Sequence, residues 1–222
     1  MITPGDRFEL LVNIVYELVR ERNFRRRRQS FVRSLPELWH VIRLARSRWN
    51  TADECDFWIE FGVYVPGVFS LIRPELKEPL CPDATNLTIS WTSGWQYPPF
   101  LARSWKLTSR DVLPETDVGI QSAVKKELIE YTLPFLEQFE HRRDVIRFLE
   151  WLRVHRMEVP GAVHIAPDDH WIPVYLAVLY WQEGDRAASL RELHTALSDE
   201  NAGIVFREMI QALQSRLLSE HR

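Results

Sequence analysis

The sequence is poor in the residues and motifs on which many enzyme active sites depend. Its 222 residues include eight glycines and two cysteines, Cys55 and Cys81. The cysteines do not have metal-ligand spacing, and we expect idle thiols, with a disulfide between them as the alternative. A nucleophile elbow, an HExxH helix, a phosphate-binding glycine loop and a dinucleotide fingerprint are all missing. We therefore expect no enzyme activity, no cofactor and no metal.

Long apolar runs are missing as well. No segment approaches the ~20 consecutive apolar residues that cross a bilayer, and the chain does not open like a signal peptide. Hydrophobic residues make up 45% of the chain and charged residues 27%, which is typical of a globular protein. We expect a cytoplasmic protein that has no membrane partner.

The charge is divided unequally along the chain. Residues 1–50 carry 11 arginines and 5 acidic residues, whereas residues 51–222 carry 17 basic and 26 acidic residues. The basic arm Arg20–Arg33 contains the run Arg25–Arg28. Arginines on an exposed strand can bind carboxylates or phosphates in a bidentate manner, and they also protect a sheet edge from aggregation. The sequence favours a solvated edge, with an acidic protein partner and nucleic acid as the alternatives.

The first half of the chain predicts a helix followed by strands. Thr3, Pro4 and Asp6 are typical of a helix start, and residues 3–22 should form a helix. Its buried stripe should consist of Phe8, Leu11, Val12, Val15, Leu18 and Val19. Residues 22–34 predict an exposed strand or hairpin arm, and 38–47 a strand. Residues 57–65 alternate with period two, and shorter strands should follow near 86–91 and 103–109.

The second half of the chain predicts helices. A helical stripe follows Glu115, and Pro134 should mark a kink or a new helix start. Another helix should run through 145–152, and residues 159–169 form a Pro-flanked linker. A helical hairpin and a third helix should follow, the third with these residues inward: Ile204, Val205, Met209, Ala212, Leu213 and Leu217. We predict an α+β fold, in which helices cover a curved antiparallel sheet (residues 1–158) and a C-terminal helical hairpin (168–222) packs on it.

Aromatic residues gather in the segment 91–100, which reads WTSGWQYPPF. Aromatic side chains on a loop held by proline are typical of interface anchors, although most of the nine tryptophans should fill the core. The predicted partner-binding residues are Trp91, Trp95, Tyr97, Phe100, Arg25, Arg26, Arg27 and Arg28.

Histidines and acidic residues offer only weak site candidates. His164, Asp168, Asp169 and His170 match the spacing of neither a zinc nor a calcium site. The alternative of an uncharacterised enzyme would require His40 or His164 to meet a carboxylate in a pocket.

The N-terminal part resembles the bacterial family catalogued as domain of unknown function 4304, over about residues 5–150. The likeness is carried by Phe24, Arg25, Arg26, Phe31, Arg33, Arg46, Ser47, Phe57, Ile59, Phe61 and Gly62. Arg46 replaces the family's usual glutamine, and the C-terminal helices fall outside the resemblance, which implies an α+β fold and no established activity.

The C-terminal hairpin is similar to a single tetratricopeptide unit through Ala177, Tyr180, Gly184, Asp185, Ala188, Ala196 and Leu197. One unit is too short for a solenoid. Some small bacterial proteins of this style look like immunity proteins. The sequence therefore predicts a protein that binds another protein without catalysis, of the immunity type that occludes a toxin, with nucleic-acid binding through Arg20–Arg33 as the alternative.

Overall fold

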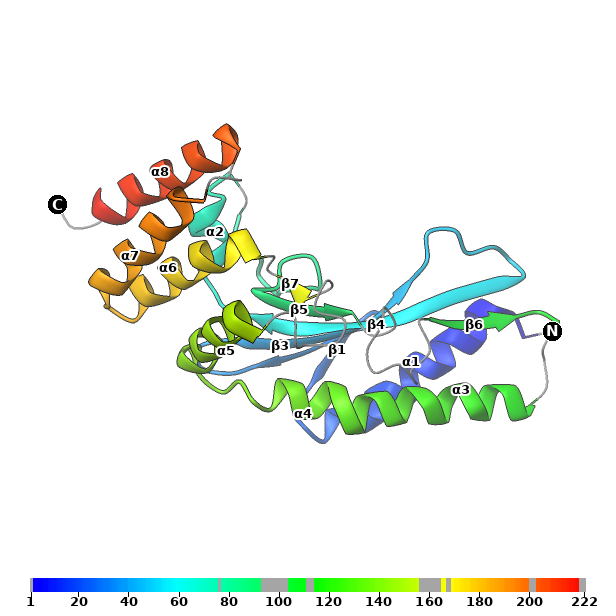
Figure 1. Cartoon of the computed structure of the whole chain (residues 1–222). Helices are drawn as coiled ribbons and strands as arrows, with labels where there is room; N and C mark the ends of the chain where they lie inside the picture. Colours follow the sequence, from blue (N-terminus) through cyan, green and yellow to red (C-terminus); the bar gives the residue numbers. More distant parts are fainter. Residues whose placement is uncertain are drawn as a thin grey trace.

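The structure, a computed structural model, describes residues 2–75, 77–92, 104–110, 114–155, 165–166, 169–199 and 203–219. The fold is α+β, as predicted, with one antiparallel sheet covered by helices (Figure 1). The strands are β1 (Arg25–Arg27), β2 (Ser30–Ser34), β3 (Trp39–Arg46), β4 (Glu54–Tyr64), β5 (Ile89–Thr92), β6 (Trp105–Thr108) and β7 (Ile165–Ala166). The helices are α1 (Pro4–Arg20), α2 (Val68–Ile72), α3 (Pro114–Glu127), α4 (Leu133–Leu136), α5 (Arg142–His155), α6 (Ile172–Gln182), α7 (Arg186–Leu197) and α8 (Ile204–Ser219).

Helix α1 begins where the sequence predicts. The Thr3 hydroxyl accepts a bond from the Asp6 backbone N–H at 3.1 Å, and the Asp6 carboxylate accepts one from the Thr3 N–H at 2.9 Å. This reciprocal capping box satisfies two N–H groups that would otherwise lack partners. The predicted stripe is buried except for Leu18, which is partly exposed. Helices α1 and α3 lie side by side on one face of the sheet (Figure 1).

Strand β4 is the centre of the sheet. The side chains of Phe57, Ile59 and Val63 are fully buried, and Trp58 and Glu60 on the other face are half-buried. The predicted alternation is confirmed up to Phe61, but Tyr64 on the second face is buried as well, in a small cluster with Val32, Val41 and Leu87. One edge of β4 pairs with β3, and the other edge pairs with β5 over residues 60–63 and with β6 over residues 54–57. The strand order is therefore β1-β2-β3-β4-β5-β7. Strand β6 lies outside this order and pairs with β4 further along the same edge as β5.

A π-helical turn, Leu128–Thr132, separates α3 from α4. Pro134 lies in the first turn of α4, directly after this π-helical turn. The helical run continues from α3 into α4 without a gap, so of the two predicted alternatives the structure shows a local distortion of one helix and not a separate helix start. Proline has no N–H and crowds the preceding turn, and a π-helical turn is one way for a helix to accommodate such a break.

Helices α6–α8 pack on α2 and α5, and their buried residues belong to the same hydrophobic cluster as the sheet. In α8 the inward residues are Ile210, Leu213 and Leu217. The predicted inward positions are therefore wrong for Ile204 and Val205, which are 77% and 79% exposed, and for the exposed Ala212. No helix in the described ranges is both long and apolar enough to cross a membrane.

Candidate functional site

The predicted basic arm forms the β1–β2 hairpin at one end of the sheet. Arg25, Arg27 and Arg28 are exposed, whereas Arg26 is half-buried and bound to α1. Its guanidinium donates to the Asn13 side chain and lies 3.3 Å from a Glu9 carboxylate oxygen. Within the run Arg25–Arg28, Arg26 is thus the anchor, and the other three arginines present their charges to solvent at a sheet edge.

Only one of the predicted aromatic anchors lies in the described part of the chain. Trp91, on β5, is half-buried and stacks on Phe61 with ring centroids 6.3 Å apart. It also meets the edge of Phe135 at 5.5 Å. Trp95, Tyr97 and Phe100 lie outside the described residues, so their role as anchors stays a prediction.

The candidate histidines and metal ligands are not brought together in the described ranges. His164 and Asp168 lie outside those ranges, and His170 packs against Phe206 at 5.3 Å. No group of three or more metal-ligating side chains was found among the residues that the structure describes. Both cysteines are free thiols.

His40 is fully buried between two partners of the same protein. Its Nδ1 lies 2.7 Å from an Arg33 guanidinium nitrogen, and its Nε2 lies 2.7 Å from the Phe139 carbonyl oxygen. Burial, followed by the Arg33 cation, lowers the pKa of His40 to about 4. A neutral imidazole fits both contacts, since Nδ1 then accepts from Arg33 and Nε2–H donates to the carbonyl oxygen. His40 therefore joins β3 to the segment after α4.

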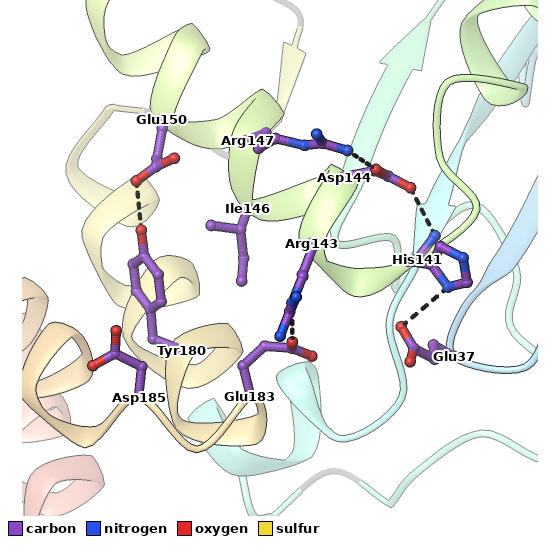
Figure 2. A pocket seen from close by; sticks show the side chains of 10 residues that line it. All are labelled: Glu37, His141, Arg143, Asp144, Ile146, Arg147, Glu150, Tyr180, Glu183 and Asp185. Atoms are coloured by element: carbon purple, nitrogen blue, oxygen red, sulfur yellow. Dashed lines mark hydrogen bonds and ion pairs between the residues drawn. The ribbon is translucent and has the colours of Figure 1, made fainter.

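A charged cleft of about 700 Å³ lies between α5 and the α6–α7 hairpin (Figure 2). It is lined by Glu37, His141, Arg143, Asp144, Ile146, Arg147, Glu150, Tyr180, Glu183 and Asp185. The Glu183 carboxylate accepts from Arg142 at 3.1 Å and from Arg143 at 2.9 Å, and the Tyr180 hydroxyl donates to Glu150 at 2.5 Å. These bonds tie α5 to α6 and the turn that follows it.

The other three carboxylates of the cleft also accept from protein donors. Asp144 accepts from the N–H of His141 at 2.8 Å and from Arg147, which together help to lower the pKa of Asp144. Glu37 accepts from the backbone N–H of Arg142 at 2.9 Å, and Asp185 caps α7 through the N–H of Ala188. The cleft is thus a network of ion pairs and caps that holds helices together.

An apolar groove of about 940 Å³ lies on the opposite side of the C-terminal helices, between α8 and the segment after α2. It is lined by Ile72, Arg73, Pro74, Glu75, Trp171, Gly203, Val205, Phe206, Met209, Ala212, Ser215 and Arg216. The edge of Trp171 meets Phe206 at 5.0 Å, and the Arg73 guanidinium lies 5.9 Å from the Trp171 ring centroid. The Arg216 Nη1 atom is buried and has no hydrogen-bond partner. The groove therefore combines mostly apolar side chains with two guanidinium groups, Arg73 and Arg216, and one carboxylate, Glu75.

This groove was not predicted from the sequence. Its residues come from three separated segments, and Val205, Met209 and Ala212 were expected in the core. One signal was present: α8 has apolar residues on more positions than one buried stripe needs, since Val205, Met209 and Ala212 accompany Ile210 and Leu213.

The comparisons with known proteins concern the N-terminal part. Searches of curated proteins and of solved structures found no match. The family model described as "Domain of unknown function (DUF4304)" matches residues 17–138, a range that runs from α1 to the end of α4 and includes the arm and β4. The match covers more than half of the chain, and it leaves α5–α8 outside. The chain therefore belongs to the DUF4304 family.

Proposed function

We propose that this protein binds another protein without catalysis, and that the groove beside α8 is the binding surface. The observation that carries the proposal is the combination of exposed apolar side chains with an unpartnered guanidinium nitrogen in one groove. Exposed apolar patches with polar margins are typical of protein interfaces. Aromatic and Arg side chains are enriched among the residues that contribute most of the binding free energy there.

The chemistry of the groove defines the partner segment. Trp171, Phe206 and Met209 would receive apolar side chains, while Arg216 would receive a carboxylate. An amphipathic helix with an acidic residue next to its apolar face meets both requirements. In its specific form, the proposal is an immunity-type protein, which occludes the active surface of a toxin.

Site-specific photo-crosslinking in the source cell tests the surface. A photoreactive side chain at Ala212 lies in the groove, and one at Gln211, exposed on the same helix but outside the groove lining, is the matched control. We expect one defined polypeptide to be linked from position 212 and not from 211, and to be lost in Phe206→Asp. Equal labelling from both positions, or none from 212, would contradict the proposal.

Toxin neutralisation has a separate test. The product of the neighbouring gene is expressed alone, with the wild-type protein, and with Phe206→Asp. We expect the wild type to restore growth and the variant to fail, because a buried charge in the interface costs several kcal/mol. Absence of toxicity from the neighbouring gene would contradict the immunity role, while leaving the crosslinking result as the measure of protein binding.

A further inference from the structure

A small cavity of about 220 Å³ lies between the sheet and the junction of α3 with α4. The sheet contributes Phe61 and Trp91 to its lining. The helical side contributes Glu127, Glu130, Tyr131, Pro134, Phe135 and Gln138, whose spacing follows one helical face. This cavity is separate from the charged cleft and from the apolar groove.

Glu127 is the unusual residue of this cavity. Its side chain is 2% exposed, and its Oε2 atom is buried without a hydrogen-bond partner. A buried carboxylate is costly unless a cation or hydrogen-bond donor compensates it. The other acidic residue of the lining, Glu130, is exposed and lies 3.9 Å from Lys126, so it already has a cation at hand. No basic side chain among the described residues of the lining is available to pair with Glu127.

The aromatic rings that line the cavity together with Glu127 indicate which class of ligand fits it. Phe61 and Trp91 stack, and Phe135 meets both rings edge-on at 5.5 Å. A ring face attracts a cation through its quadrupole. A carboxylate and aromatic rings around one cavity are thus complementary to an ammonium group that carries an apolar substituent. The π-helical turn that follows Glu127 is a feature often found at functional sites.

We propose that this cavity binds a small organic cation, a protonated amine with an apolar body, whose ammonium group pairs with Glu127. The ammonium donates to the unpartnered carboxylate oxygen, and the apolar body lies against Trp91 and Phe135. This site is independent of the protein-binding groove, because the two share no residue.

Proton release provides a signature that a merely structural carboxylate would not give. Burial raises the pKa of Glu127 to about 7, so the folded protein carries this group partly protonated at neutral pH. Glu130 and Tyr131 are the other titratable residues of the described lining, and the sheet side contributes none. An ammonium ion binds the ionised carboxylate, so binding should release about half a proton per ligand at pH 7 and strengthen roughly tenfold from pH 6 to pH 8.

The experiment is calorimetric titration of the full-length protein with benzylammonium chloride, with benzyl alcohol as the neutral analogue of similar shape. We expect the cation to bind at least about tenfold more tightly than the alcohol, a difference of about 1.4 kcal/mol. Titrations at pH 7 in two buffers that differ in ionisation enthalpy measure the proton release. Equal affinity for both probes, or no binding of the cation, would overturn the proposal.

Variants then assign the site. Glu127→Gln keeps the shape and removes the charge, and Glu130→Gln is the matched control at the exposed acid of the same lining. We expect the first to weaken benzylammonium binding at least about tenfold and the second by less than about threefold. Trp91→Leu, which keeps an apolar residue but removes the ring face, should weaken it severalfold. Unchanged affinity in Glu127→Gln would show that the cation binds elsewhere.

Discussion

At the residue scale, His40 and Glu127 are two buried titratable groups whose roles the sequence did not predict. His40 was named, as an alternative to His164, as a histidine that would meet a carboxylate in an enzyme pocket, whereas the structure places it against Arg33 and the Phe139 carbonyl oxygen. Glu127 was not named, because its place in the sequence, beside Lys125 and Lys126, is typical of a solvated helix face. Only the approach of β4 and β5 makes Glu127 a buried acid.

These two residues should give opposite pH dependences of stability. The pKa of His40 falls from an ordinary 6.5 to about 4, and the pKa of Glu127 rises from 4.5 to about 7. Between pH 4.5 and 6.5 the unfolded chain therefore holds more protons at His40, and the folded protein holds more at Glu127. Stability rises with pH where the unfolded state binds more protons, so the two contributions oppose each other in this window.

Single variants should reveal how each residue changes the pH dependence of the free energy of unfolding. In Glu127→Gln we expect the free energy of unfolding, relative to wild type, to gain about 3 kcal/mol between pH 4.5 and 7, since one unit of pKa shift is worth 1.36 kcal/mol. In His40→Gln the rise that His40 contributes between pH 4 and 6.5 should be lost, so the free energy of unfolding, relative to wild type, should fall by a similar amount over this range. Urea unfolding across this pH range measures both changes, with the exposed Glu130→Gln and His141→Gln as controls. Wild-type slopes in both variants would contradict the assignment.

At the element scale, Gly62 determines how closely β5 approaches β4. A Cβ atom at this position would lie 2.0 Å from the Ile89 carbonyl oxygen, which is backbone that cannot move without breaking the strand pair. We expect Gly62→Ala to lower the melting temperature by about 6–12 °C, as a clash worth about 3 kcal/mol would do in a chain of this size.

Gly119→Ala is the control for this substitution. Gly119 lies exposed in α3, and a Cβ atom there meets nothing within 4 Å. Alanine should stabilise the helix by about 0.5–1 kcal/mol. If the melting temperatures of both variants shift equally, the close approach of the strands is not the cause.

Strands β5 and β6 run in the same direction, and both pair with the same edge of β4. An inserted segment separates the two strands in the sequence, and they pair with different residues of β4. Thr92 pairs with Glu60 and Trp105 pairs with Phe57, so only Trp58 and Ile59 separate the two pairings on β4. Deletion of residues 94–103 would leave Ser93 and Ser104 opposite these two positions, in one continuous strand.

We expect this deletion variant to fold, with a melting temperature within about 5 °C of wild type, because closing a shorter connection costs less entropy. The deletion also removes the predicted anchors Trp95, Tyr97 and Phe100. Loss of the crosslinked partner in the folded variant would support those anchors, whereas unfolding of the variant would show that the segment supplies core contacts.

Local signals in the sequence predicted the helices and strands well. Contacts between elements that are distant in the chain could not be predicted from it. The capping box of α1 and the alternation of β4 depend on residues close together in the chain, so both were predicted with their burial patterns. In α8 two neighbouring stripes are apolar, and the sequence alone could not tell which one faces α7. The same limitation hid the groove, since its floor combines Trp171 with residues near 73 and 206.

At the scale of the whole molecule, exposed arginines gather at one edge of the sheet, where Arg25, Arg27 and Arg28 lie on the β1–β2 hairpin. In the charged cleft between α5 and the α6–α7 turn, by contrast, arginines and carboxylates are paired with one another. Three exposed arginines on one edge keep nucleic-acid binding as an alternative to an acidic protein partner.

We expect Arg25→Ser, Arg27→Ser and Arg28→Ser, combined in one variant, to leave the melting temperature within about 2 °C, because exposed charges contribute little to stability. If the arm binds nucleic acid, the wild type should bind a duplex with an affinity that falls steeply with salt, and the variant should lose up to about three units of that slope. Fluorescence anisotropy at several salt concentrations measures this. Equal slopes would remove the nucleic-acid alternative.

The ion pair between Arg7 and Asp117 has a consequence for biosynthesis. Arg7 is almost fully buried, and it also donates to the carbonyl oxygen of Thr108 at 2.7 Å, across a separation of 101 residues. These two partners follow Arg7 by 101 and 110 residues in the chain, whereas strands β1 and β4, which also contact α1, are made much earlier. The nascent helix can therefore pack on β4 first, and the bonds of Arg7 can close only afterwards, when α3 has been made.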